Sequence, residues 1–289
     1  MRYIVSREIL NQNIDSAQTM IGSRKLSLMF KEYYERMYLL VDQHPTGDIF
    51  AINLQDSICY ALGMANEKNK GALVNNIIDV KALHDKGMSQ FYIPIDTCDG
   101  REGLPVYEAK LLAEAIHEFI GKKTLVTGMV TNGCINDLHL KTKEEWKELW
   151  SAFGNHLTGL SVGGSYWLDK AKDLPEFVRD VRIGRFMLFG YIPYSYNKYG
   201  RNCMVVEGNV LGVNLRHRKV MVDLGDAYCD PAQCMPYNED LVFTESSSNY
   251  ALYTTPQAFR YYIGQRLLFT PNYKHSSALA RLEVQYDYE

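Results

Sequence analysis

The residues best suited to chemistry stand where apolar runs end. Lys31 follows Lys25–Phe30, in which Leu26, Leu28 and Phe30 alternate with other residues as in a short buried strand. Active sites of parallel α/β barrels are built at the C-terminal ends of the strands, so a lysine there is a candidate Schiff-base former. The alternative interpretation is a solvated lysine that starts a surface helix.

Two later strand ends carry groups that suit an anion or a ring. Gly163-Gly164-Ser165 follows a strand and can cradle a phosphate, because glycines let backbone amides approach the oxygens and a hydroxyl adds a donor. Arg182-Ile183-Gly184 lies on the next strand, and an arginine directed into a barrel is costly unless it meets a ligand or a carboxylate. The alternative for Gly163–Ser165 is an ordinary turn. The alternative for Arg182 is an ion pair with an acid of a neighbouring strand. Asp99–Gly103 holds Arg101 either in a capped turn or as an oriented guanidinium.

Strands and helices alternate over the first two thirds of the chain, which is typical of a parallel sheet, and the lack of a dinucleotide-binding glycine motif favours a closed sheet. After about residue 194 short strands are separated by Gly, Pro, Asn and Asp. We therefore expect an α/β barrel over residues 1–195 and a β-rich domain over 196–289, with residues 1–8 able to pair with the latter. The expected elements are helices 9–20, 32–42, 56–64, 79–87, 105–120 and 143–153, and strands 3–6, 25–31, 49–53, 72–75, 91–96, 124–130, 157–162, 180–189, 203–206, 209–213, 219–223, 241–243, 250–253 and 264–269.

Composition narrows the class of protein. Apolar residues make up 46% and charged residues 22%, which excludes disorder, and a net charge of −3 gives no case for nucleic acid or an anionic membrane. The start of the chain has no apolar core for a signal peptide, and no run approaches a membrane span, so we expect a cytoplasmic protein. The six cysteines form no CxxC pair and have no histidine at metal-ligand spacing, so we expect reduced thiols and no metal.

The order of these motifs resembles the fold-type III pyridoxal-phosphate enzymes of the alanine racemase group, in particular its shorter alanine/ornithine (broad amino-acid) racemase branch. Residues 96–103 are similar to D-x-G-D-x-R-E-G, residues 128–134 to G-x-x-T-N-x-G-C, and residues 181–190 to L-R-I-G-x-x-x-L-x-G. Further similar stretches at 222–226, 230–231, 246–249, 263–264, 269 and 272–273 extend the resemblance over nearly the whole chain.

The resemblance implies a TIM-type barrel that holds pyridoxal 5'-phosphate as an aldimine on Lys31, in an enzyme that racemises a free amino acid. It also implies a homodimer. Because an arginine keeps its proton, such a donor leaves the ring nitrogen unprotonated and favours proton return over transamination. The other residues carry over as follows: Gly164, Ser165 and Gly184 to the phosphate, Arg182 to the ring nitrogen, Asn132 beside the ring, Arg101 to the cofactor or the substrate carboxylate, and Ser248 and Asn249 to the substrate.

The sequence also departs from this pattern. Gly225 is followed by Asp226 where alanine racemases carry a catalytic tyrosine, so Cys134 is our candidate second base, with a small buried residue as the alternative. Asn132 replaces a histidine. Between Lys31 and Asp96 the pattern shows two of the three strand–helix units of the family, so either the barrel is short by one unit or one strand is disguised. A non-catalytic pyridoxal-phosphate-binding protein and an amino-acid decarboxylase of the same fold type remain alternative functions.

Overall fold

A computed structural model describes residues 1–30, 46–51, 71–97, 103–130, 143–192, 199–227, 229–272 and 284–287. The chain divides into two compact units, which we describe separately. The barrel unit comprises residues 13–187 and 191–199, and the β unit comprises residues 1–12, 188–190 and 200–289.

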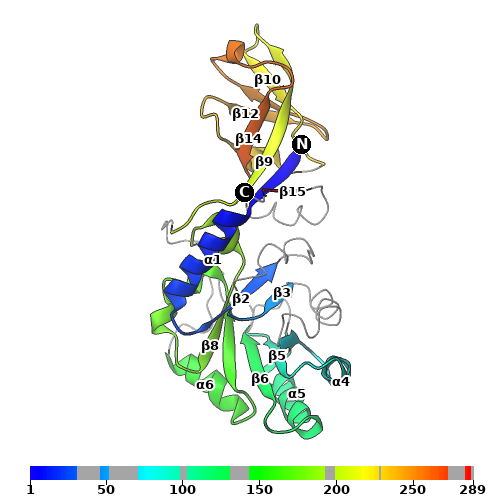
Figure 1. Cartoon of the computed structure of the whole chain (residues 1–289), viewed down its shortest axis with the longest axis vertical. Coiled ribbons are helices and arrows are strands. Elements are labelled where there is room, and N and C mark those ends of the chain that lie inside the picture. The colour runs from blue at the N-terminus through cyan, green and yellow to red at the C-terminus, as the bar shows by residue number, and fades with distance from the viewer. Residues whose placement is uncertain are drawn as a thin grey trace. The chain divides into compact units, whose positions relative to one another are not determined.

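The barrel unit is built on one parallel sheet of seven strands (Figure 1). The strands follow the order β3-β2-β8-β7-β6-β5-β4, so the sheet is a nearly closed TIM-type barrel, as the sequence predicts. Its strands are β2 (Lys25–Phe30), β3 (Ile49–Ala51), β4 (Gly71–Leu73), β5 (Gln90–Ile95), β6 (Leu125–Val130), β7 (Gly159–Gly163) and β8 (Val178–Ile183).

Asp48 joins the two ends of this sheet through its side chain. It directly precedes β3, and its Oδ1 accepts a hydrogen bond from the amide of Gly71 on β4 at 3.0 Å. Its Oδ2 accepts one from the hydroxyl of Tyr92 on β5 at 2.8 Å. Between β2 and β5 the described residues contribute two strands, β3 and β4, and residues 52–70 between them lie outside the described part of the chain.

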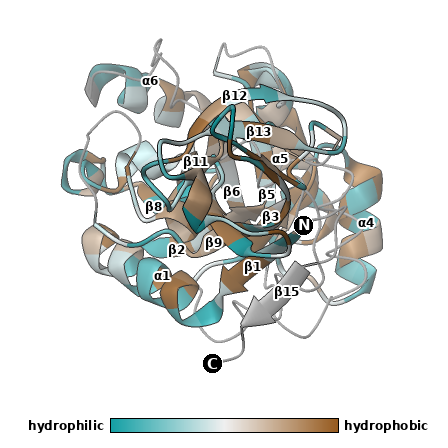
Figure 2. Ribbon diagram, turned by 90° about the horizontal axis from the view of Figure 1, so that it is seen from above, coloured by the Kyte–Doolittle hydropathy of each residue, from teal (hydrophilic) through white to brown (hydrophobic). Residues whose placement is uncertain are grey.

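Helices α4 (Ile77–Asp85), α5 (Val106–Phe119) and α6 (Lys143–Phe153) lie outside the barrel strands (Figure 2). Asn76 caps α4 by accepting from the amides of Ile78 and Asp79, and Gly87 follows the helix with a φ of 91°, as a C-terminal stop requires. The buried residues of α5 recur at helical spacing and cover β5: Ala109, Leu112, Ala113 and Ile116.

One predicted element of the barrel unit is wrong. The expected strand 180–189 ends at Ile183, and residues Arg185–Phe189 form the short helix α7. Gly184 separates the two, and the amide of Phe186 donates to the hydroxyl of Ser165 instead of to a neighbouring strand. The predicted helices 32–42 and 56–64 lie outside the described residues.

The β unit contains an eight-stranded sheet with the main order β11-β14-β9-β10-β13-β12, to which β1 and β15 are added. The two strands expected at 203–206 and 209–213 are one strand, β9. Gly208 is not a turn: a Cβ there would lie 2.7 Å from the side chain of Val222, so the glycine permits close packing. The strands are β1 (Arg2–Ser6), β9 (Met204–Asn214), β10 (Lys219–Val222), β11 (Met235–Pro236), β12 (Val242–Ser246), β13 (Ala251–Thr254), β14 (Arg266–Thr270) and β15 (Val284–Asp287), and helix α1 (Arg7–Ile21) begins directly after β1.

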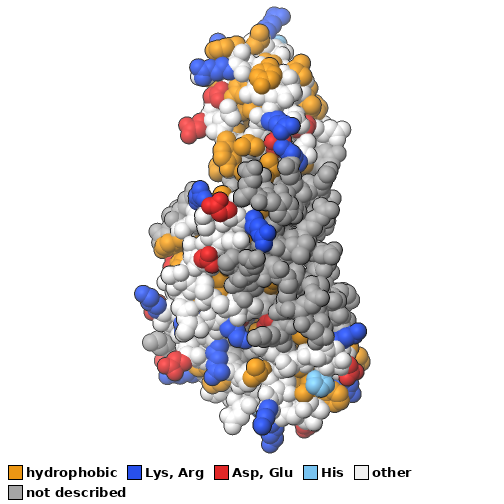
Figure 3. Space-filling model, in the orientation of Figure 1, with side chains coloured by type: hydrophobic (Ala, Val, Ile, Leu, Met, Phe, Trp, Pro, Cys, Tyr) orange, Lys and Arg blue, Asp and Glu red, His pale blue; other side chains and the backbone are white. Residues whose placement is uncertain are grey.

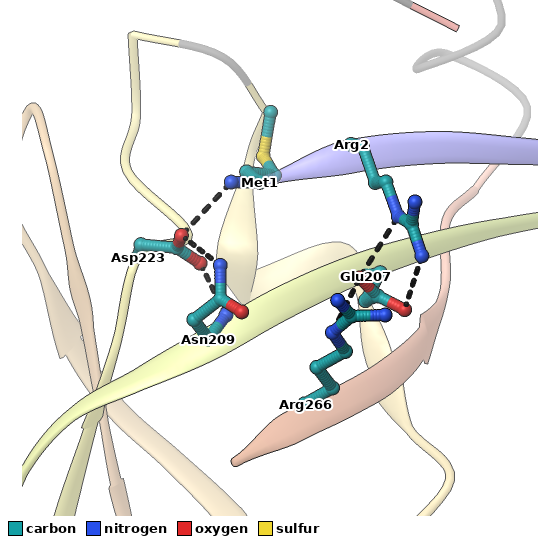
Figure 4. Close-up of polar contacts among 6 residues, drawn as sticks. All are labelled: Met1, Arg2, Glu207, Asn209, Asp223 and Arg266. Carbon is teal, nitrogen blue, oxygen red and sulfur yellow. Dashed lines mark hydrogen bonds and ion pairs between the residues drawn. The ribbon is translucent and has the colours of Figure 1, made fainter. Parts of the chain in front are cut away.

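Charged contacts fix β1 to β9 within this unit (Figure 4). Glu207 accepts from Nε and Nη2 of Arg2 at 2.9 and 3.1 Å, and Nε of Arg266 lies 3.7 Å from the same carboxylate. Asp223 accepts from the backbone amide of Asn209 at 2.6 Å, and the amino group of Met1 lies 2.8 Å from it. The first strand of the chain is therefore part of the β unit.

Side chains of both charges are interspersed on the face shown in Figure 3. This distribution agrees with the small net charge of −3. Within the described ranges, no helix has the length and apolar character needed to cross a membrane.

Candidate active site

Arg182 is the centre of the candidate site. It lies on β8, its side chain is buried, and its guanidinium points between β7 and β6. Nη1 donates to the carbonyl and to the hydroxyl of Ser161 at 2.7 and 2.9 Å. Nη2 donates to the carbonyl of Val130, the last residue of β6, at 2.6 Å. These bonds hold the plane of the guanidinium between the middle of β7 and the end of β6.

One donor of this guanidinium has no acceptor. Nε of Arg182 is buried and makes no hydrogen bond among the described residues. Leaving a buried donor unsatisfied costs about 1–3 kcal/mol, and more for a charged group. An acceptor atom of a ligand would remove that cost, and the nitrogen of an aromatic ring is an acceptor of suitable shape.

The strand ends beside Arg182 carry the glycine–serine turn. The amide of Gly164 donates to the carbonyl of Arg182 at 2.9 Å, and Gly164 has a φ of 111°, which favours glycine. The hydroxyl of Ser165 accepts from the amide of Phe186 at 3.0 Å. The structure thus brings Gly164, Ser165, Arg182 and Gly184 together at the ends of β7 and β8, which are neighbours in the sheet.

Asp180 lies two residues before Arg182 on β8 and links three strands. It is buried on β8, and its Oδ2 accepts from the hydroxyl of Ser27 on β2 at 2.5 Å. Its Oδ1 accepts from the hydroxyl of Ser161 on β7. The two serines come from the strands that flank β8, so this carboxylate binds both neighbours of its own strand. Arg182 forms no direct ion pair within the described residues, but it shares the hydroxyl of Ser161 with Asp180 as a hydrogen-bond partner.

A second set of hydrogen bonds continues across the barrel interior. The hydroxyl of Ser27 also accepts from the amide of Asp48 at 3.1 Å. The hydroxyl of Tyr92, which donates to Asp48, accepts from Nε2 of Gln90 at 2.8 Å, and Oε1 of Gln90 accepts from Nζ of Lys25 at 3.2 Å. A continuous polar network therefore runs from Lys25 to Arg182 through the barrel.

Burial dominates the protonation of this network. It lowers the pKa of Arg182 to about 10, against the opposing effect of Asp180 and Tyr92, so the guanidinium stays charged at neutral pH. Burial also raises the pKa of Asp180, while its two serine partners and Arg182 act in the opposite direction. The pKa of Tyr92 is raised by burial and by the charges of Asp180 and Asp48, so this phenol stays neutral.

The remaining predicted site residues divide into two sets. Ser248 and Asn249 lie in the β unit, where both are exposed and pack their backbone against Gly225. Asp226, the residue that follows this glycine, accepts from the hydroxyl of Ser246 at 2.7 Å. Four predicted residues lie outside the described part of the chain: Lys31, Arg101, Asn132 and Cys134.

The sequence analysis missed the residues that hold Arg182 in place. Ser27, Ser161 and Asp180 were treated as ordinary strand positions, and Gly163 was given no role beside Arg182. A signal was nevertheless present on β2 and β8, where polar residues recur two positions apart: Lys25 and Ser27, and Asp180 and Arg182. In a barrel, that spacing places them on the inner face.

We expect Gly163→Ala to displace the guanidinium of Arg182. A Cβ at this position would lie 2.6 Å from Nη2, and the guanidinium is held from both sides by Ser161 and Val130. Overpacking of this kind costs about 1–3 kcal/mol. Urea unfolding should show that loss, and Gly212→Ala is a control for adding a methyl group, since its φ is not in the left-handed region and the nearest atom to a Cβ there is the end of the Met221 side chain at 3.4 Å. Equal losses in the two variants would contradict the predicted clash.

Comparisons with known proteins give a consistent fold. No family model and no curated protein sequence matches the chain. Among solved structures, the D-threo-3-hydroxyaspartate dehydratase from Delftia sp. HT23 is 14% identical with a TM-score of 0.68, over 99% of this chain and 93% of that one. The alanine racemase from Corynebacterium glutamicum is 12% identical with a TM-score of 0.70, over 96% and 93%. The D-threonine aldolase from Filomicrobium marinum is 13% identical with a TM-score of 0.62, over 99% and 91%.

These proteins share one architecture, a parallel barrel joined to an antiparallel β domain. The chain has this architecture over nearly its whole length, and it is the alanine racemase fold. The fold expected from the resemblance in sequence is therefore confirmed. Because racemase, dehydratase and aldolase activities all occur on it, the reaction must be argued from the site.

Proposed function

We propose that this protein is a pyridoxal-phosphate-dependent amino-acid racemase. The observation that carries the proposal is the buried Nε of Arg182, which has no acceptor among the described residues and fits the ring nitrogen of the cofactor. Gly164, Ser165 and Gly184 would bind the phosphate, since they stand together at the neighbouring strand ends. When bound, pyridoxal phosphate supplies an electron sink that makes the Cα proton of an amino acid labile.

Lys31 would attach the cofactor and move the proton at Cα on one face. Its place directly after β2 supports this role, because Lys25 and Ser27 reach the polar network of the barrel interior and the two-residue period of a strand predicts the same side for position 31. Two acid–base groups are needed for inversion, one on each face. Cys134 is the candidate for the second.

Arg182 favours racemisation over reactions that need a protonated ring. Its pKa of about 10 remains well above neutral pH, so it donates a hydrogen bond without giving up its proton. A ring nitrogen that stays unprotonated withdraws electrons weakly, and quick return of the proton to Cα is then favoured. This distinguishes racemisation from the decarboxylase alternative.

The β unit would complete the site in a homodimer. Ser248 and Asn249 are exposed on it, which leaves them accessible to a substrate or to a second subunit. Arg101 would bind the cofactor or the substrate carboxylate, and Asn132 would lie beside the ring. The substrate would be a free amino acid.

Exchange of the Cα proton in deuterated water tests the proposal. The protein, supplied with pyridoxal phosphate, is incubated with single enantiomers of a panel of amino acids, and the products are analysed by mass spectrometry and chiral chromatography. We expect inversion coupled to incorporation of deuterium at Cα. Oxo acid and ammonia would instead indicate a dehydratase, and an amine and carbon dioxide a decarboxylase. Cofactor binding without any exchange would indicate a non-catalytic binding protein.

A further inference from the structure

We propose that Asp180 is a positioning residue that orients the guanidinium of Arg182 through the hydroxyl of Ser161. The inference rests on the proposed function for its consequence, because the oriented donor is the one assigned to the cofactor ring. The hydrogen bonds on which it depends belong to the protein itself.

We call the hydrogen bonds that join Asp180 to Arg182 through Ser161 the relay. The direction of each of them follows from the chemistry of the groups. A guanidinium only donates, so the hydroxyl oxygen of Ser161 accepts from Nη1 of Arg182. The same hydroxyl donates a hydrogen bond to Oδ1 of Asp180. Without an acceptor below it, the hydroxyl could rotate and present its proton elsewhere. Asp180 therefore keeps a lone pair of Ser161 directed at Arg182.

The relay also decides which donor of Arg182 is left for a ligand. Both protons of Nη1 are used by Ser161, and Nη2 is fixed by the carbonyl of Val130. Nε is buried and has no acceptor in the described part of the chain. Nε is thus the one nitrogen of the guanidinium without an acceptor among the described residues, and the group that fixes the orientation of its N–H is a carboxylate two residues earlier on the same strand.

Ser27 makes the second bond to Asp180, and among the described residues its hydroxyl makes no hydrogen bond to the guanidinium of Arg182. Its hydroxyl donates to Oδ2 at 2.5 Å and is as fully buried as that of Ser161. The two serines are therefore matched in burial and in partner, and only one of them leads to the guanidinium. This gives a control for the purely structural cost of losing a buried hydroxyl beside the carboxylate.

The test compares binding of pyridoxal phosphate with binding of its deaza analogue, in which the ring nitrogen is replaced by carbon. The preference of the wild-type protein for pyridoxal phosphate measures the contact with Arg182. We expect Ser161→Ala and Asp180→Asn each to reduce this preference by about tenfold, the size of one charge-assisted hydrogen bond. The double variant should be little worse than either single variant, since both act through one path. Ser27→Ala should keep the preference within about twofold.

The outcomes separate the two proposals. A wild-type protein that binds both compounds equally, or neither, would refute the assignment of the cofactor ring to Arg182. A wild-type preference that survives in Asp180→Asn and Ser161→Ala, or that falls equally in Ser27→Ala, would refute the positioning role.

A second measurement works without any cofactor. The Nε–H of Arg182 gives a signal in a ¹H–¹⁵N spectrum. The signal is assigned by comparison with Arg182→Lys, in whose spectrum it should be missing. We expect this signal to shift and to exchange faster with solvent in Asp180→Asn and Ser161→Ala, but not in Ser27→Ala. An unchanged signal in all three variants would overturn the positioning role, whether or not the protein binds pyridoxal phosphate.

Discussion

Replacing Arg182 with methionine is expected to lower the free energy of unfolding by about 3–5 kcal/mol at neutral pH. The guanidinium donates to Ser161 and Val130, and its charge compensates the buried carboxylate of Asp180. Methionine fills much of the same volume but leaves the carbonyl of Val130 without a donor and Asp180 without a nearby cation. Urea unfolding of the wild-type protein and of Arg182→Met measures the difference in the free energy of unfolding.

The deficit should depend on pH, because Asp180 can be neutralised. Burial raises the pKa of Asp180, and Arg182 acts against that rise. Without Arg182 the pKa in the folded protein is higher still, and Asp48 and Tyr92 nearby supply no positive charge. An acid with a raised folded pKa stabilises the fold below its unfolded pKa of about 3.9, and that stabilisation is lost as pH rises through the folded pKa. The variant should therefore regain stability relative to the wild type between neutral and acidic pH.

Arg179→Met is a suitable control for this substitution. Arg179 lies on the same strand but is exposed, and surface changes of this kind are usually within about 0.5 kcal/mol. A comparable loss in both variants, or a deficit in Arg182→Met that is the same at every pH, would contradict the idea that Arg182 and Asp180 compensate one another inside the barrel.

The order of strands and helices was predictable because it depends on local patterns. Alternation of apolar runs with amphipathic segments acts over a few residues, and Gly87, where the helix 79–87 was expected to end, does follow α4 with a positive φ. The two errors also have local causes. Gly184 was treated as part of a strand that it ends, and Gly208 was treated as a break in a strand that it allows to pack closely.

The network around Arg182 was not predictable in the same way. Ser161 and Asp180 lie on the consecutive strands β7 and β8, but Ser27 precedes Asp180 by 153 residues and becomes its neighbour only through the order β2-β8-β7. The sequence analysis considered an acid on a neighbouring strand as the partner of Arg182. The carboxylate is instead on the same strand and acts through a serine of the neighbour, an arrangement that depends on the register of Ser161 opposite Asp180.

Strand register also fixes the position of Arg182 relative to β2, the strand that leads to Lys31. Ser27 is paired with Arg182 between β2 and β8, and its side chain bonds to Asp180. A shift of β2 by one residue would turn its polar side chains away from the barrel interior and break this bond. The network therefore fixes where β2 ends relative to Arg182, which a lysine at that end needs in order to reach a cofactor bound by Arg182.

Lys31→Ala should reduce Cα proton exchange by about 10³-fold or more, because it removes both the attachment of the cofactor and one acid–base group. Treatment of the wild-type protein with pyridoxal phosphate and borohydride should leave the cofactor bound irreversibly to the peptide that contains Lys31, as mass spectrometry would show. The alanine variant should lack this modification while still binding the cofactor reversibly, since Arg182 and the glycine–serine turn are intact.

Lys25→Ala is the matched control, because it removes an amine from the same strand. Nζ of Lys25 donates to Gln90 at 3.2 Å, at the opposite end of β2 from Lys31. If strand position selects the reactive amine, this variant keeps the modification at Lys31 and most of the exchange activity. Modification of Lys25 in the wild-type protein, or unchanged exchange in Lys31→Ala, would place the reacting amine at the wrong end of the strand and remove the basis for a site beside Arg182.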